Sequence, residues 1–217
     1  KFPEGYSLQG PAVPAYGLEH LSAGNVIYND LNGDKTITND DREIIGSAYP
    51  AFTGGFTTSM DYKGFDLSFA LSFSYGGKVM NFTDYYIYNM EGSSNQYGIL
   101  RERYRSDDQP GNGVTPIAFR HGNKNTGMKI SDRFIEDASY IRVANLSIGY
   151  NVPYSIIEKC GISGLRVYVS GDNLLTFTNY MGFNPEVDYK SSNLMPGFDW
   201  GCYPLARTVT AGVKVTF

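Results

Sequence analysis

The sequence lacks several features that would define common classes of protein. It has no run of about eighteen apolar residues, which a transmembrane helix would need. Its two cysteines, Cys160 and Cys202, do not make a disulfide framework. The net charge of −4 gives no reason to expect a nucleic-acid partner. The histidines His20 and His121 stand alone, without a nucleophile or metal-ligand spacing, which argues against an enzyme.

What the sequence does have is alternation between apolar and polar side chains, clearest in residues 208–217. Successive side chains of a strand point to opposite faces, so this segment is expected to be a strand with one apolar and one polar face. A half-buried strand of a soluble sheet can show the same pattern. The aromatic last residue is more distinctive, because outer-membrane β-barrels commonly end this way. The apolar set is Val209, Ala211, Val213, Val215 and Phe217.

The same alternation recurs in four earlier runs, at residues 52–62, 64–75, 140–150 and 166–173. The first two meet at Tyr62-Lys63-Gly64, which is a hairpin signal ending in glycine. In the second run the apolar positions are Phe65, Leu67, Phe69, Leu71, Phe73 and Tyr75. In the run 140–150 the residues expected to share one face are Tyr140, Ala144, Leu146, Ile148 and Tyr150.

Two fold classes fit these runs. In a soluble sandwich the apolar faces would pack against a second sheet. In a transmembrane antiparallel β-barrel they would face lipid, while small polar residues line a lumen. Each run is about ten residues long, which suits a tilted strand that crosses a bilayer. Tyrosines stand at the ends of the runs, where an aromatic girdle would lie.

The lengths of the connections favour the barrel. The connections at 62–64 and 151–165 are short, whereas the others are long and polar. Outer-membrane barrels have short periplasmic turns and long extracellular loops. The expected organisation is an extracellular loop at 1–50, a β-hairpin at 51–75, an extracellular loop at 76–138, two strands joined by a periplasmic turn at 139–175, an extracellular loop at 176–205 and a closing strand at 206–217.

Five strands are too few to close a membrane barrel, because the smallest such barrels have about eight. Open strand edges in lipid would leave backbone groups unpaired. No signal peptide is recognisable, and residues 1–4 resemble the interior of a longer chain. We therefore expect the chain to be the carboxy-terminal piece of a larger barrel.

Several segments together resemble a known family. Residues 25–46, 62–68, 132–150, 165–177 and 201–208 are similar, in order, to the end of SusC/RagA-type TonB-dependent transporters of Bacteroidota. The resemblance implies a bacterial outer-membrane barrel of about twenty-two strands, of which this chain would form the last five.

The resemblance also implies the partners. SusC-like barrels pair with a SusD-like surface lipoprotein, are energised by TonB, and import oligosaccharides or peptides. The plug domain and the segment that contacts TonB lie amino-terminal in this family and have no counterpart in the printed sequence. We expect no required cofactor, and no enzymatic activity, because no acid/base pair or nucleophile is recognisable in the sequence.

One motif has chemistry of its own, in residues 30–41. Oxygen-bearing side chains occupy positions 1, 3, 5, 9 and 12 of a calcium-type loop, and position 7 would offer its carbonyl. The sequence departs from the pattern at Lys35, where glycine is usual, and at position 12, where aspartate replaces glutamate. The alternative is an Asx-rich turn that bonds its own backbone and caps a short helix. The candidate ligands of a Ca²⁺ ion are Asp30, Asn32, Asp34, Thr36, Thr38 and Asp41.

Two further alternatives stay open. The aromatic segment 82–90 could stack on a sugar or a peptide, but packing of the loop is favoured, and a helix is one conformation open to the segment. The competing function is a secreted, calcium-stabilised β-sandwich used for adhesion or glycan binding. The orientation of Phe65, Phe69 and Phe73 separates the two functions, because these residues face lipid in a barrel and a core in a sandwich.

Overall fold

The computed structural model describes residues 23–88, 90, 95–118, 130–187 and 196–217. The chain divides into two compact units. The loop unit comprises Lys1–Ile45 and Phe82–Phe134, and the sheet unit comprises Gly46–Asn81 and Ile135–Phe217. Each unit is considered by itself below.

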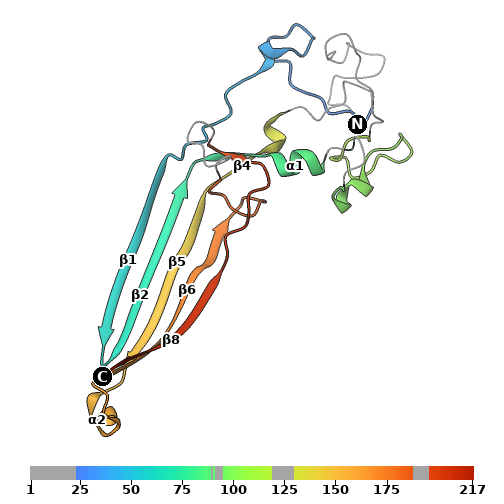
Figure 1. Ribbon diagram of the computed structural model, residues 1–217. Helices are drawn as coiled ribbons and strands as arrows, with labels where there is room; N and C mark the ends of the chain where they lie inside the picture. The colour runs from blue at the N-terminus through green and yellow to red at the C-terminus, as the bar shows by residue number, and fades with distance from the viewer. Residues whose placement is uncertain (1–22, 89, 91–94, 119–129, 188–195) are drawn as a thin grey trace. The chain divides into compact units, whose positions relative to one another are not determined.

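The sheet unit contains a five-stranded antiparallel sheet in the order β1-β2-β5-β6-β8 (Figure 1). Each of the five alternating runs forms one of its strands, which confirms a mostly β, antiparallel fold. The strands are β1 (Phe52–Tyr62), β2 (Phe65–Tyr75), β5 (Tyr140–Asn151), β6 (Gly164–Thr178) and β8 (Thr208–Thr216).

The short connections lie together at one end of this sheet. Lys63 and Gly64 form the two-residue turn between β1 and β2, with φ of 48° and 87°. Two positive φ angles match the right-handed twist of a hairpin, and glycine adopts them without strain. Helix α2 (Tyr154–Ile157) and the 3-10 helix η4 (Glu158–Cys160) join β5 to β6 at the same end, where the carboxy-terminus also lies (Figure 1).

The strand register places the apolar residues of all five strands on one face. Leu67 of β2 stands between Met60 of β1 and Ile148 of β5, which pairs with Val169 of β6. Val169 in turn pairs with Ala211 of β8. The opposite, polar face carries serine, threonine, glycine and charged residues, as the alternation predicts.

A β-bulge interrupts this alternation in β5. Phe69 pairs with Leu146 and Phe73 pairs with Ile141, so β5 contains one more residue than β2 over the same length. The unpaired residue is Ala144. A second irregularity lies beside it in β6, where Asn173 and Leu174 have no partner in β5. Bulges of this kind change the face to which the following side chains point.

The bulge overturns one expectation from the sequence. Tyr140 pairs with Ser74 and Arg142 pairs with Ser72, so both residues belong to the polar face. The alternation alone placed Tyr140 on the apolar face with Leu146. One extra residue between them shifts the two-residue period and reverses the assignment.

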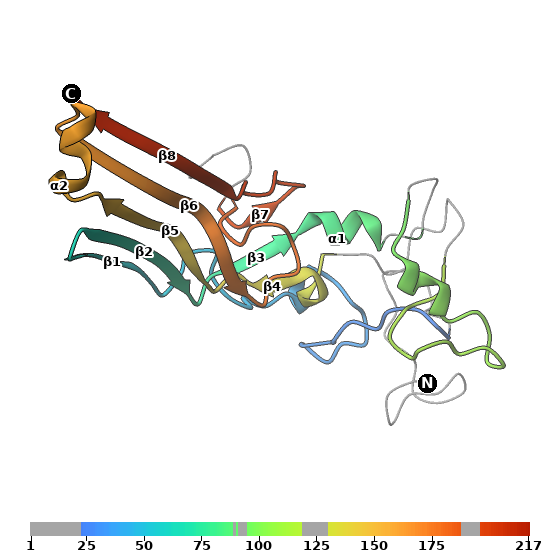
Figure 2. The same ribbon diagram turned by 90° about the horizontal axis from the view of Figure 1, so that it is seen from below.

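A small sheet follows the other end of the long strands, away from α2 (Figure 2). It has the order β4-β3-β7, with β3 (Lys78–Asn81) between β4 (Ile135–Asp137) and β7 (Phe198–Asp199). The sequence did not indicate these short strands, since none is long enough to show a period. A buried apolar cluster beside them comprises Val79, Ala138, Tyr180 and Val187.

The loop unit contains the helix α1 (Phe82–Ile87) and the 3-10 helices η1 (Asn39–Asp41), η2 (Gly98–Glu102) and η3 (Asp132–Phe134). The Tyr85 ring lies 5.3 Å from the ring of Phe134, which is almost fully buried. Aromatic packing of this kind stabilises short helices that would not form alone. Over the described part of the chain, no helix has the length and hydropathy that crossing a bilayer requires.

The five-stranded sheet has two free edges among the described residues, at β1 and at β8. Closure into a barrel and a total of twenty-two strands therefore stay predictions. The assignment of loops to the extracellular or periplasmic side also stays a prediction.

Candidate functional site

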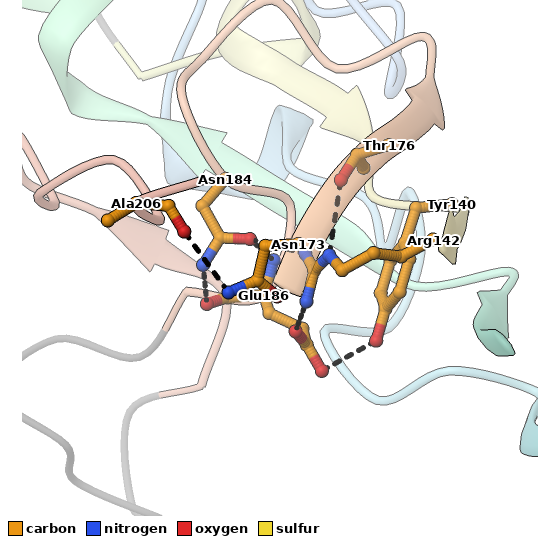
Figure 3. Close-up of polar contacts among 7 residues, drawn as sticks. All are labelled: Tyr140, Arg142, Asn173, Thr176, Asn184, Glu186 and Ala206. Atoms are coloured by element: carbon orange, nitrogen blue, oxygen red, sulfur yellow. Dashed lines mark hydrogen bonds and ion pairs between the residues drawn. The ribbon is translucent and has the colours of Figure 1, made fainter. Parts of the chain in front are cut away.

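The most elaborate polar cluster surrounds Arg142 on the polar face of the sheet (Figure 3). Its Nε donates to Thr176 Oγ1 at 3.1 Å, and its Nη2 donates to Asn184 Oδ1 at 2.9 Å. Its Nη1 forms an ion pair with Glu186 Oε2. The Tyr140 hydroxyl donates to the other carboxylate oxygen of Glu186 at 2.5 Å. The planar fork of the guanidinium thus contacts β6 and the loop that follows it.

Arg142 is covered by this loop. The residue is only 5% exposed, although it projects from the polar face of the sheet. Its guanidinium carbon lies 4.7 Å from the centre of the Tyr140 ring, within the range of a cation–π contact. Hydrogen bonds to charged groups contribute about 1.5–3 kcal/mol each. The cluster therefore holds residues 184–186 against the polar face.

The loop is attached at its beginning as well. The Tyr180 hydroxyl donates to Asp199 Oδ2 at 2.5 Å, and both residues are buried. The backbone N–H of Met181 donates to Glu136 at 2.7 Å. Asp199 also accepts the N–H groups of Gly201 and Cys202 at 2.9 Å. The segment thus connects β6 with the small sheet.

A close approach fixes the path of the loop at Gly182. A Cβ atom at this position would lie 2.4 Å from the Tyr180 ring, far closer than van der Waals contact. The Tyr180 side chain occupies that space because its ring belongs to the buried apolar cluster and its hydroxyl is bonded to Asp199. Any side chain at position 182 would push the Tyr180 ring out of the cluster or break its hydrogen bond to Asp199.

A second polar cluster lies at the other end of the polar face. Arg166 of β6 forms a two-pronged ion pair with Asp66 of β2, with Nε–Oδ1 at 2.9 Å and Nη2–Oδ2 at 2.5 Å. The Asn151 amide also donates to Asp66, at 3.2 Å. Between the two clusters, Asn145 donates to Asp172 at 2.7 Å. Polar side chains therefore link β2, β5 and β6 at several points along the polar face.

Asn173 connects the bulge in β6 to the chain that enters β8. It adopts a φ of 52°, which asparagine tolerates better than most residues. Its amide donates to the Ala206 carbonyl at 3.3 Å (Figure 3). This contact fixes where the chain returns to the sheet.

The structure describes every predicted calcium ligand in the segment 30–41. Asp30 accepts the N–H groups of Gly33 and Lys35, both at 2.7 Å. Asn32 accepts the N–H of Asp34 at 2.8 Å, and Asp34 accepts that of Thr36 at 2.7 Å. The side chains of the motif therefore converge on one compact turn.

The end of this turn is a helix cap. Thr38 and Asp41 form a capping box at the start of η1, and Asp41 also accepts the N–H of Leu31 at 3.0 Å. The bond from the Thr38 N–H is the main reason that the pKa of Asp41 lies below its ordinary value. These bonds are what the Asx-rich turn predicts. Among the described residues no group of three or more His, Cys, Asp or Glu could hold a metal ion. Calcium at Asp30, Asn32, Asp34, Thr36, Thr38 and Asp41 stays a prediction.

The remaining candidates have structural partners or lie outside the described residues. Within the aromatic segment, Tyr85 packs on Phe134 and Tyr88 lies 5.0 Å from Tyr97. His20 and His121 fall outside the described residues. Cys160 and Cys202 are both free thiols.

The sequence did not identify Arg142 and Glu186 as partners. The signal was the pair Val143-Ala144, in which two apolar residues adjoin inside an alternating run. Such a pair indicates a bulge, and a bulge places Arg142 on the polar face. Glu186 lies in an irregular loop, so no period could have pointed to it.

Comparison with known proteins gives the family. TonB-dependent receptor P3 of Formosa agariphila is 36% identical over 100% of this chain and 20% of its own length. TonB-dependent receptor SusC of Bacteroides thetaiotaomicron is 31% identical over 88% of this chain and 17% of its own length. No protein-family model matches.

Solved structures agree. The structure of the RagAB peptide transporter superposes with a TM-score of 0.69 and 26% identity, over 90% of this chain and 20% of that chain. The RagAB peptide importer in its closed-closed state gives a TM-score of 0.67 at the same identity. This chain thus spans about one fifth of the relatives it matches. These relatives are receptors and importers of the outer membrane, and the chain belongs to the SusC/RagA-type TonB-dependent transporters.

Proposed function

We propose that this chain forms part of the wall and mouth of a TonB-dependent importer that takes up oligosaccharides or peptides together with a SusD-like surface lipoprotein. The apolar face of the five-stranded sheet carries the proposal. Phe56, Met60, Val209 and Val213 lie on it and are each more than half exposed. A face of this kind suits lipid, and the opposite polar face suits a water-filled lumen.

Aromatic residues at both ends of the apolar face support this orientation. At one end the rings of Phe52 and Tyr75 stack at 5.3 Å. At the other end the rings of Phe65 and Tyr150 lie 4.5 Å apart. Membrane barrels carry aromatic girdles at both interfaces, with apolar side chains between them. The end with α2 and the short turn would be periplasmic, and the end with the small sheet extracellular.

The other functional parts belong to the longer protein. A plug, the remaining strands of the barrel and the segment that contacts TonB would complete the importer. RagAB is described as a peptide transporter, which supports peptides as one substrate class. Oligosaccharides are the other class that the sequence resemblance implies. The polar face offers both classes a wall of hydroxyl, amide and charged groups.

Cysteine labelling in intact cells tests the orientation. The assay uses the full transporter with Cys202→Ser, which leaves Cys160 beside α2, and adds Tyr203→Cys at the opposite end. A thiol reagent that cannot cross the outer membrane should label the residue-203 thiol at once and Cys160 only after permeabilisation. Val213→Cys, on the apolar face, should react only with a lipid-soluble reagent. Equal labelling of all three positions, with the protein in the soluble fraction, would indicate the secreted β-sandwich instead.

Uptake tests the function itself. Cells that lack the transporter should lose growth on either oligosaccharides or peptides as carbon source, and the full-length gene should restore it. Deletion of the neighbouring lipoprotein gene should reduce growth on the same substrate. Unchanged growth on both substrate classes would contradict the proposal.

A further inference from the structure

We infer that residues 180–187 form a fixed loop that folds inward over the polar face and narrows the lumen, with Arg142 as the residue that positions it. The inference rests on the proposed function, which makes the polar face the wall of the lumen. It concerns a part of the wall that neither the strands nor the family resemblance specifies.

The position of the loop follows from the register. Arg142 pairs with Ser72 of β2 and with Thr176 of β6, on the polar face. Ser72 lies three residues inside the end of β2 at Tyr75, a distance of about 10 Å at about 3.3 Å per residue. Asn184 and Glu186 contact Arg142 at this depth. The loop therefore extends down the face of the sheet instead of projecting beyond the strand ends.

The loop is held at several points, unlike a mobile lid. Tyr180 and Val187, at its two ends, are both 5% exposed and belong to the same buried cluster. Between them, Met181 is bonded to Glu136, and Gly182 packs directly on the Tyr180 ring. Segments that open easily have few buried contacts and few protected hydrogen bonds. This loop has both.

The charge arrangement suits a wall that meets water. The Arg142 side chain is 6% exposed, whereas the side chain of Glu186 is 51% exposed. The loop thus covers the cation and presents the carboxylate edge to the lumen. A fixed loop at this depth limits the size of what can pass, and it does so without opening and closing.

Size-graded thiol labelling tests the inference in the full transporter with its lipoprotein. In a Cys160→Ser, Cys202→Ser background, Ser72→Cys places a thiol beside Arg142, its pairing partner in β5, at the depth where the loop is held. Thr53→Cys is the matched control, because Thr53 pairs with Ser74 on the same face, at the same end, in the distant strand β1. Intact cells are treated with a small maleimide and with a polyethylene-glycol maleimide several times larger.

The expected result is that the small reagent labels both thiols, while the large one labels only the residue-53 thiol. Arg142→Met should then raise labelling of the residue-72 thiol by the large reagent at least about tenfold. Hydrogen bonds to a charged group stabilise the held position of the loop, and their loss raises the fraction of displaced loop by about that factor or more. Glu186→Gln, a milder change at a half-exposed residue, should give a smaller rise in the same direction.

Two results would overturn the inference. The large reagent could label the residue-72 thiol equally well with and without Arg142, or the Arg142 change could affect the residue-53 thiol just as much. Failure of the proposed function would look different. In that case the Val213→Cys thiol, on the apolar face, would react with water-soluble reagents whatever the state of the loop.

Discussion

The guanidinium of Arg166 reaches across a neighbouring strand to form a two-pronged ion pair with Asp66. The strand between them is β5, and the residue beneath the pair is Gly149. A Cβ atom on Gly149 would lie 2.5 Å from Asp66 Oδ1 and 2.7 Å from Arg166 Nη2. Glycine is therefore the residue that lets two side chains from separate strands meet above the backbone.

Gly149→Ala should displace this ion pair and destabilise the folded transporter. We expect a loss of about 1 kcal/mol, at the low end of the overpacking range, because the clashing atoms are side-chain ends that can move. Thermal unfolding of the purified transporter measures the effect. Gly98→Ala is the control, since a Cβ there meets nothing within 4 Å. Equal unfolding midpoints for the two variants would contradict the prediction.

Tyr180→Phe should loosen the loop that Arg142 holds. The change removes the buried hydrogen bond to Asp199, and loss of such a bond costs about 1–3 kcal/mol. Faster hydrogen exchange at residues 180–187 is the expected result, with assembly of the transporter unchanged. Tyr203→Phe serves as the matched control, because Tyr203 is 89% exposed. If both variants exchange like the wild type, the hydroxyl of Tyr180 does not hold the loop.

Calcium binding to the turn at residues 30–41 should depend on Asp30. Its two carboxylate oxygens accept the N–H groups of Gly33 and Lys35, so they already point toward the centre of the turn. Asp30→Asn is expected to weaken calcium affinity at least about tenfold, because it removes one negative ligand from the loop. Titration calorimetry of the metal-free transporter measures this. Asp40→Asn is the control, since Asp40 donates its backbone N–H to Thr38 and is not one of the candidate ligands. A wild-type titration without binding heat would leave the Asx-rich turn as the sole interpretation.

The pH dependence of stability should report on Asp137 and Ser139. The Ser139 hydroxyl, followed by its N–H at 2.7 Å, holds the pKa of Asp137 below the ordinary value of 3.8. Because the unfolded chain takes up the proton first, this contribution is complete above pH 3.8 and is lost as the pH falls through the lower, folded pKa.

Ser139→Ala should therefore make the stability lost in acid smaller, and that smaller loss should end at a higher pH, nearer 3.8. Unfolding midpoints measured between roughly pH 6 and pH 2 would show the shift. Ser163→Ala is the control, because the Ser163 hydroxyl donates to a backbone carbonyl at the other end of the sheet. An identical acid profile for the two variants would show that Ser139 does not govern Asp137.

The long strands could be predicted from the sequence because their period is set by local geometry. Side chains alternate along every strand, so the run Phe65, Leu67 and Phe69 indicates a strand wherever its partner lies. The hairpin at Lys63 and Gly64 was also predictable, because so short a connection between two alternating runs ends in a glycine, which adopts a positive φ without strain.

The candidate site could not be predicted in the same way. The contact between Arg142 and Glu186 joins residues 44 apart in the sequence, and an irregular loop supplies one of them. No local rule decides where such a loop lies, because its path depends on the buried cluster around Tyr180. The short strands β3, β4 and β7 could not be predicted for a related reason, because they form only where distant segments meet.

The bulge at Ala144 divides β5 into two segments, and odd- and even-numbered residues exchange faces between them. Residues after it follow one parity, with even numbers toward the apolar face, and residues before it follow the other. If β5 kept all its residues but had no bulge, the alternation would run unbroken along the strand, and Arg142 would then face outward while Ile141 faced inward. One bulged residue thus decides whether the neighbouring loop has a cation to hold it.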